Sequence, residues 1–260
     1  RGGSPVLFRE RRIVMTLLEE TLDLPTLTGP MRAQIFRPSN AGKFPGVVLW
    51  SEIFQITGPI RRTAAMLAGH GFVVVVPEVY HELVEGPGVV LAYDQTGADR
   101  GNACKIQKEL SSYDADAAAC VEALLHHPSC TGKVGSWGMC LGGHLAFRCA
   151  LHPTVLAGVC FYATDIHKRS LGKGMNDDTL VRMKDVRAEM CMIWGRQDPH
   201  VPREGRRLIY DAMTDAGVNF TWHEFNGQHA FLRDEGARFD PELARVCYDM
   251  GIGLLKRKLT

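Results

Sequence analysis

Short, almost unbroken apolar runs, separated by segments with a helical pattern, constrain the fold of this chain more than any other feature. The runs Phe44–Trp50 and Phe72–Val76 lack the polar–apolar alternation of a half-exposed strand, so they predict strands buried on both faces of a sheet. Further strands are expected at 133–136, 156–162, 190–194 and 219–225, and helices at 59–69, 110–124, 141–150, 202–216 and from 240 onward. This alternation predicts a single α/β domain over residues 1–260, with a mostly parallel sheet and helices on both faces.

Three segments fall outside this alternation. Ile13–Leu18 and Met31–Phe36 flank turn signals and predict an antiparallel pair of strands at the start of the domain. Residues 81–103 are rich in glycine with scattered charges, and they predict a long irregular loop. Because long loops are uncommon unless they are functional, we expect this one at the rim of an active site. Residues 1–12 are expected to be a disordered N-terminal arm.

Charge and cysteine content exclude several classes of protein. The 30 Lys and Arg residues nearly balance the 29 Asp and Glu residues, for a net charge of +1, so neither a nucleic-acid nor a membrane partner is expected. The eight cysteines contain no Cys-x-x-Cys pair, and those in apolar runs are typical of small buried side chains. We therefore expect a cytoplasmic protein, a monomer or a homodimer, without a metal. No phosphate-binding glycine motif is present, and no cofactor is expected.

The segment Gly138-Met-Cys140-Leu-Gly142-Gly143 lies between a predicted strand and a predicted helix. It has the spacing of the nucleophile elbow Gly-x-Ser-x-Gly, with Cys140 in place of serine. Such a turn leaves no room for side chains two residues before and after the nucleophile, and the helix N-terminus favours a thiolate. The alternative is a tight turn around a buried cysteine, but the flanking strand and helix favour the elbow. The pattern predicts Cys140 as nucleophile and the N–H of Leu141 as an oxyanion donor.

An elbow of this kind requires an acid and then a base later in the chain. Asp198 follows a buried strand and precedes a helix, which suits the acid, although an aspartate in a turn is common in any protein. His229 follows the last strand on a loop and is the candidate base. His200 and His223 compete for this role. His200 is only two residues from Asp198, and His223 lies within a strand, so both fit less well.

Together these motifs make the chain resemble the dienelactone hydrolase family of α/β-hydrolases over roughly residues 30–255. The matching segments are Ser51-Glu52-Ile53-Phe54, Gly138-Met-Cys140-Leu-Gly142-Gly143, Gly195-Arg-Gln-Asp198 and Gly227-Gln-His229-Ala-Phe-Leu-Arg233. The resemblance implies the α/β-hydrolase fold and a Cys140–His229–Asp198 triad that cleaves enol-lactone and ester bonds. It also implies that Glu52 contacts the resting cysteine and helps to deprotonate it when substrate enters. The N–H of Ile53 is implied as the second oxyanion donor.

One position departs from the family pattern. Members that cleave dienelactone hold the substrate carboxylate with two arginines, and Arg233 matches the one that follows the histidine by four residues. Glu82 occupies the place of the other, with Tyr80 beside it, and we expect both to contact the substrate. Arg100 could substitute for the lost arginine. Because Glu82 would repel a carboxylate, we expect weak activity on dienelactone and better activity on neutral esters or lactones.

The sequence therefore predicts a hydrolase that cleaves a small lactone or carboxylic ester through Cys140, His229 and Asp198. The first alternative is a general carboxylesterase on the same scaffold, which activity on simple aryl esters without activity on dienelactone would favour. The second is a non-catalytic binding protein on a hydrolase fold. An electrophilic ester probe separates the classes, because an enzyme would form an adduct on Cys140.

Overall fold

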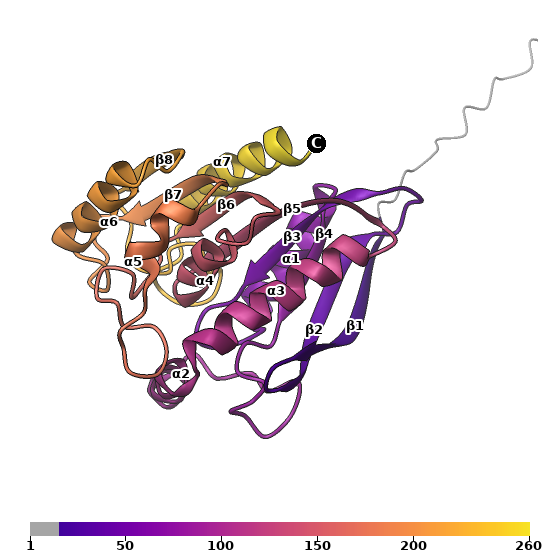
Figure 1. Ribbon diagram of the computed structural model, residues 1–260, viewed down its shortest axis with the longest axis horizontal. Helices are drawn as coiled ribbons and strands as arrows, with labels where there is room; N and C mark the ends of the chain where they lie inside the picture. The colour runs from indigo at the N-terminus through magenta and orange to yellow at the C-terminus, as the bar shows by residue number, and fades with distance from the viewer. Residues whose placement is uncertain (1–15) are drawn as a thin grey trace, which may run out of the picture.

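An eight-stranded sheet runs through the middle of the molecule (Figure 1). The structure is a computed structural model that describes residues 16–260, so the arm expected at residues 1–12 lies outside the described residues. The strands within this range are β1 (Leu17–Thr26), β2 (Gly29–Pro38), β3 (Phe44–Trp50), β4 (Val73–Pro77), β5 (Cys130–Met139), β6 (Val155–Phe161), β7 (Glu189–Gly195) and β8 (Phe220–Phe225).

The sheet is mixed, with its parallel part in the majority. The strand order is β1-β2-β4-β3-β5-β6-β7-β8. β2 is antiparallel to both β1 and β4, and every pair from β4–β3 to β7–β8 is parallel. The expected antiparallel pair and the mostly parallel sheet are both confirmed.

Helices cover both faces of this sheet. Those in the described part of the chain are α1 (Gly58–Gly69), α2 (Gln95–Gln107), α3 (Leu110–His126), α4 (Leu141–Cys149), the short α5 (Thr179–Arg182), α6 (Arg203–Asp215) and α7 (Pro241–Leu259). A Cβ on Gly135 of β5 would meet Leu255 of α7 at 2.7 Å, whereas the next residue, Ser136, donates a hydrogen bond from Oγ to a carbonyl oxygen of α4 at 2.8 Å. Because successive strand residues point to opposite faces, α7 and α4 lie on opposite sides of the sheet.

The first strand differs from its predicted position. It was expected at 13–18 and is observed at Leu17–Thr26, while residues 13–15 lie outside the described residues. β1 therefore includes Pro25, a residue of the turn signals that were expected to separate the two strands. Proline is tolerated there because β1 is the edge strand and has a partner on one side only.

The segment predicted as a long irregular loop contains a helix. Residues 95–107 form α2, opened by the Asp94 side chain, which accepts a hydrogen bond from Gly97 N at 2.8 Å. Two glycines lower the helical propensity of this polar segment, so the sequence pattern did not predict a helix here. Both are required by close packing. A Cβ on Gly97 would lie 2.0 Å from Ala92 O, and one on Gly101 would lie 2.5 Å from Ile53 O. α2 therefore packs directly against the loop after β3.

The loops that carry the predicted catalytic residues leave the same edge of the sheet. Because β3, β5, β7 and β8 lie in its parallel part, their carboxyl ends share one edge, where sites collect in open α/β sheets. Glu52 follows β3, Cys140 follows β5, Asp198 follows β7 and His229 follows β8.

Candidate active site

Cys140 occupies a strained turn between β5 and α4. Its φ is +58°, a left-handed value that a non-glycine residue adopts at a cost of about 1–3 kcal/mol. The turn is closed by its two glycines. A Cβ on Gly138 would lie 1.9 Å from Gly142 O, and a Cβ on Gly142 would lie 2.2 Å from Trp50 O. The backbone therefore has the shape that the elbow spacing predicts, with Cys140 at its tip.

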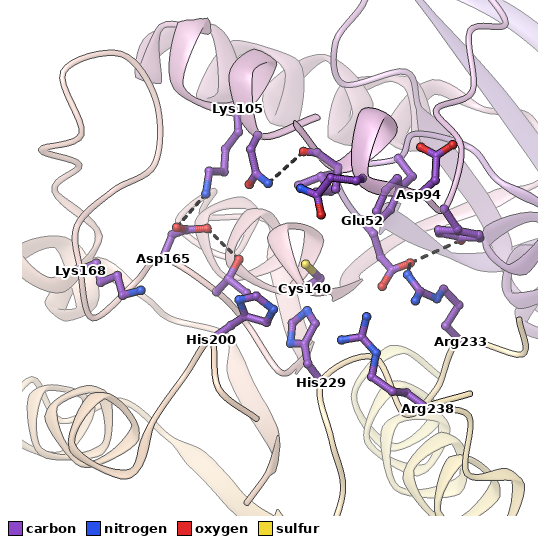
Figure 2. Close-up of a pocket in the computed structure, with 17 residues that line it drawn as sticks. Glu52, Asp94, Lys105, Cys140, Asp165, Lys168, His200, His229, Arg233 and Arg238 are labelled. Carbon is purple, nitrogen blue, oxygen red and sulfur yellow. Dashed lines mark hydrogen bonds and ion pairs between the residues drawn. The ribbon is translucent and has the colours of Figure 1, made fainter. Parts of the chain in front are cut away.

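His229 and Asp198 are joined across two neighbouring loops. His229 Nδ1 lies 2.7 Å from Asp198 Oδ2, and the other carboxylate oxygen accepts the backbone N–H of His200 at 2.7 Å. The loops are held together by close backbone contact, since a Cβ on Gly195 would lie 2.4 Å from Gly227 O. The histidine ring is thereby fixed on one side and presents its other nitrogen to Cys140 (Figure 2).

The surroundings of His229 favour its protonated form. Burial opposes the charge, but the electrostatic interaction with Cys140, together with hydrogen bonds to Asp198 and Cys140, raises the pKa of His229 to about 10. Burial also works against the charge of Asp198, but the hydrogen bond to His229 and the charge of its ring outweigh this effect and lower the pKa of Asp198. This arrangement can hold a thiolate beside an imidazolium and can pass a proton to a group bound at Cys140.

Two backbone N–H groups near Cys140 have no partner within residues 16–260. Leu141 is the first residue of α4, so its N–H has no acceptor inside the helix. Ile53 lines the cavity on the loop after β3. Neither group donates a hydrogen bond to a described residue. Unused donors at a helix N-terminus and on a neighbouring loop suit the binding of a developing oxyanion.

Glu52 is buried, with 4% of its surface exposed. Its Oε2 accepts a hydrogen bond from Tyr93 Oη at 3.4 Å and lies 3.7 Å from Arg233 Nη1. Burial raises the pKa of Glu52, while the charges of Arg233 and His229 act in the opposite direction. The family resemblance implies a contact with the resting cysteine. In this structure the side-chain contacts of Glu52 are with Tyr93 and Arg233, and Cys140 pairs with His229.

A cavity of about 490 Å³ opens above Cys140. Its charged lining residues are the cations Lys105, Lys168, Arg233 and Arg238 and the acids Glu52, Asp94 and Asp165. Figure 2 shows Arg233 and Arg238 on one side of Cys140 and Lys105 and Lys168 on the other. The volume lies within the usual range for small-molecule sites, and the surplus of cations suits an anionic ligand.

The predicted placement of Glu82 and Tyr80 at this cavity is wrong. Glu82 turns instead to Lys108 Nζ and Ser112 Oγ, both of which donate hydrogen bonds to it, and it does not line the cavity. Tyr80 is 1% exposed and also lies outside the lining. Arg100 pairs with the exposed Glu85 at 2.7 Å and supplies no cation to the site. Arg238, which the sequence analysis did not single out, lines the cavity.

The two competing histidines have different positions. His200 lines the cavity, and its ring centroid is 4.5 Å from that of His229. Burial, together with the charge of His229, lowers the pKa of His200, which favours its neutral form. His223 stacks on Phe225 within β8 and does not line the cavity. The Asp198 carboxylate therefore orients His229 and neither of the others.

Sequence reasoning missed several lining residues, among them Tyr93, Arg238 and Lys168. Tyr93 reaches the site from the segment before α2, and the Arg233 guanidinium lies 4.2 Å from the centroid of its ring. Arg238 follows Arg233 by five residues, so a second arginine on the histidine loop was a signal that could have been used. Lys168 lies on the loop after β6, and nothing in the sequence marks it.

The described part of the chain has neither a metal-binding group of side chains nor a membrane-spanning helix. No group of three or more His, Cys, Asp and Glu side chains between residues 16 and 260 is arranged to hold a metal ion. In the same range, no helix is both long and apolar enough to cross a membrane.

The sheet order, the cysteine elbow after β5 and the histidine after the last strand define an α/β-hydrolase. Comparison with solved structures agrees with this class. A Klebsiella pneumoniae protein with the provisional name dienelactone hydrolase superimposes with a TM-score of 0.81 at 21% identity, over 93% of this chain and 99% of its own. The sequence model of the dienelactone hydrolase family matches residues 31–257. The chain belongs to the dienelactone hydrolase family.

Curated relatives extend this result. A Saccharomyces cerevisiae protein with the provisional name carboxymethylenebutenolidase is 45% identical, over 94% of this chain and 93% of its own length. The carboxymethylenebutenolidase of Pseudomonas sp. strain P51 is 29% identical, over 83% of this chain and 86% of its own. The resemblance inferred from four short motifs is thus confirmed over nearly the whole chain.

Proposed function

We propose that this chain hydrolyses a small carboxylic ester or lactone through Cys140, His229 and Asp198. The observation that carries the proposal is that Cys140, His229 and the unused N–H of Ile53 meet at one cavity, with Asp198 bonded to His229 and the unused N–H of Leu141 next to Cys140. His229 is bonded to Asp198 on one ring nitrogen and paired with Cys140 on the other. The names of the curated relatives, carboxymethylenebutenolidases, support the same chemistry.

The first half of the reaction forms a thioester. The Cys140 thiolate attacks the carbonyl carbon, and the N–H groups of Leu141 and Ile53 stabilise the negative oxygen that develops. The bond from this carbon to the alcohol oxygen then breaks, and the imidazolium of His229 gives its proton to the departing alkoxide. In a lactone the released alcohol stays attached to the acyl group.

The second half restores the enzyme. Neutral His229 takes a proton from water as the water oxygen attacks the thioester carbon. The carbon–sulfur bond breaks, so the products are the free acid, a thiolate on Cys140 and an imidazolium on His229. Asp198 stays ionised throughout and holds the ring in the orientation that both proton transfers require.

We propose that Glu52 orients Arg233 in the resting enzyme, since these two groups lie 3.7 Å apart. If Glu52 also helps to deprotonate Cys140 when substrate enters, as the family resemblance implies, Glu52→Gln should slow acylation in pre-steady-state kinetics. An unchanged acylation rate would mean that His229 alone activates the thiol.

The arginines favour a substrate that carries a carboxylate. This preference is the opposite of the one for neutral esters or lactones that was expected from Glu82. Arg233 and Arg238 line the same side of the cavity, and no described acidic side chain lies within ion-pairing distance of Arg238. The guanidinium fork suits a carboxylate in a two-bond geometry. We therefore propose that carboxylated lactones or esters are cleaved better than their methyl esters.

The cellular location of the enzyme is also a proposal. All eight cysteines are buried and free, which supports a reducing, cytoplasmic location. That the protein is a monomer or a homodimer, and that it needs no cofactor and no nucleic-acid or membrane partner, remain predictions from the sequence.

A panel of lactones and aryl esters, each with and without a carboxylate, tests the proposed function in the wild type and in Cys140→Ala. The variant should lose hydrolysis and keep its melting temperature. The matched control is Cys160→Ala in β6, because Cys160 is fully buried and lies outside the cavity. It should lose stability and keep its turnover per folded molecule. Turnover by Cys140→Ala close to that of the wild type would show that Cys140 is not the nucleophile.

A further inference from the structure

Cations line the cavity on both sides of Cys140, and the proposed function uses only one side. Arg233 and Arg238 form the side assigned above to the substrate carboxylate. Lys105 of α2 and Lys168 of the loop after β6 line the opposite side, next to His200 (Figure 2). These lysines have no part in the steps described for the triad.

One of the two lysines is already neutralised. Lys105 Nζ lies 2.9 Å from Asp165 Oδ1, and both side chains are largely buried. Asp165 also accepts hydrogen bonds from Thr164 Oγ1 at 2.7 Å and Ser170 Oγ at 2.8 Å. Burial works against its charge, but the charge of Lys105 and these hydrogen bonds outweigh it and lower the pKa of Asp165, so this carboxylate is ionised at neutral pH. Lys105 and Asp165 therefore form a fixed ion pair with no net charge on this side of the cavity.

Lys168 differs from its neighbour. It is exposed, it lines the cavity, and no described acidic side chain lies within ion-pairing distance of it. The loop that carries it is nonetheless fixed, because Lys168 N donates to Asp165 O at 3.2 Å and the following N–H donates to Ile166 O. Its charge lies close enough to His200 to contribute, after burial and the charges of His229 and Arg238, to the lowered pKa of that ring. Lys168 is thus an unpaired cation held at the mouth of the site.

We propose that Lys168 binds a second anionic group, so that the substrate carries one anion on each side of the bond that is cleaved. The proposal rests on the proposed function, since it takes Cys140 as the reacting centre. It extends that function to a substrate class: esters or lactones with two anionic groups, one toward Arg233 and Arg238 and one toward Lys168. A cavity of about 490 Å³ has room for such a molecule.

Four aryl esters test this proposal: a neutral ester, one with a carboxylate on the acyl part, one with a carboxylate on the phenol, and one with both. In the wild type, kcat/KM should be highest for the doubly charged ester. Lys168→Met should reduce the charged-to-neutral ratio of kcat/KM for one of the singly charged esters by about five-fold, near the upper limit for a solvent-accessible ion pair. Arg238→Gln should reduce the ratio for the other. Added salt should weaken both preferences.

The matched control is Lys184→Met, because Lys184 is exposed in the 3₁₀ helix Met183–Asp185 and does not line the cavity. Its ratios should equal those of the wild type. The proposal is overturned if Lys168→Met changes neither ratio, or if Lys168→Met and Arg238→Gln act on the same ester. The proposed function fails separately, if Cys140→Ala still cleaves the neutral ester.

Discussion

Replacing Asp198 with asparagine should disable the enzyme while leaving the fold intact. The side chains of Asp198 and His229 are 1% and 7% exposed, and their hydrogen bond measures 2.7 Å, so water screens it little. A charge-assisted hydrogen bond of this kind contributes about 1.5–3 kcal/mol, which corresponds to roughly ten- to a hundred-fold in rate.

Asp198→Asn causes a second loss through the proton on the ring. The asparagine oxygen can keep the bond from the His200 N–H, which leaves its NH₂ group facing His229 Nδ1. That nitrogen must then accept, so the ring carries its proton on Nε2, toward Cys140, and cannot take another from the thiol or from water. The two losses together predict a fall in kcat of about 10³–10⁴.

The assay is hydrolysis of an activated aryl ester by the wild type and the variant, with thermal melts to show that both are folded. Asp215→Asn is the matched control, since Asp215 is exposed at the end of α6 and should leave kcat unchanged. A folded Asp198→Asn protein that lost less than about five-fold in kcat would refute the assignment of Asp198 as the group that orients His229.

Three further predictions follow from the packing and the charges. A Cβ on Gly142 would lie 2.2 Å from a backbone carbonyl oxygen, so Gly142→Ala should lower both activity and melting temperature. The control is Gly253→Ala in α7, where a Cβ would have nothing within 4 Å, and this variant should raise the free energy of unfolding by about 1 kcal/mol. Glu82→Arg should leave the buried Lys108 beside a second cation and lower the free energy of unfolding in urea by about 3 kcal/mol. If this variant also changed the ratio of kcat/KM for carboxylated and neutral esters, Glu82 would have to lie at the cavity. Because the pKa of His229 is raised from 6.5 to about 10, the stability that its charge contributes is complete below about pH 6.5 and is lost as the pH rises through 10. The difference in unfolding free energy between the wild type and His229→Gln should therefore shrink between about pH 6 and 10.5, and a constant difference would contradict this origin.

The sequence predicted the positions of the candidate catalytic residues better than the rest of the cavity lining. Cys140 could be placed at the tip of a turn because the elbow is a local structure: its glycines, strand and helix are all within a short segment. Asp198 and His229 could be recognised because each follows a buried strand, and the carboxyl ends of parallel strands meet at one edge. These inferences depend on chain order and strand direction, which apolar patterns reveal.

The substrate side depends on how loops lie relative to one another, which those patterns do not reveal. Glu82 was aligned with an arginine by its distance from a strand, yet its side chain turns to the buried Lys108. Arg238 and Lys168 reach the cavity from loops after different strands. α2 was not predicted because its two glycines are unfavourable in an isolated helix, and the contact that requires Gly101 is with Ile53 on a loop far away in the sequence.

Capture of the acyl-enzyme tests the central claim most directly. The wild type is mixed with an activated aryl ester, quenched in acid within the first turnover and digested, and the peptides are weighed by mass spectrometry. A good leaving group speeds acylation more than hydrolysis of the thioester, so the intermediate should accumulate. We predict that the acyl mass appears on the peptide that contains Cys140 and is absent in Cys140→Ala. An acyl group on another residue, or product formation in Cys140→Ala at the wild-type rate, would contradict the account.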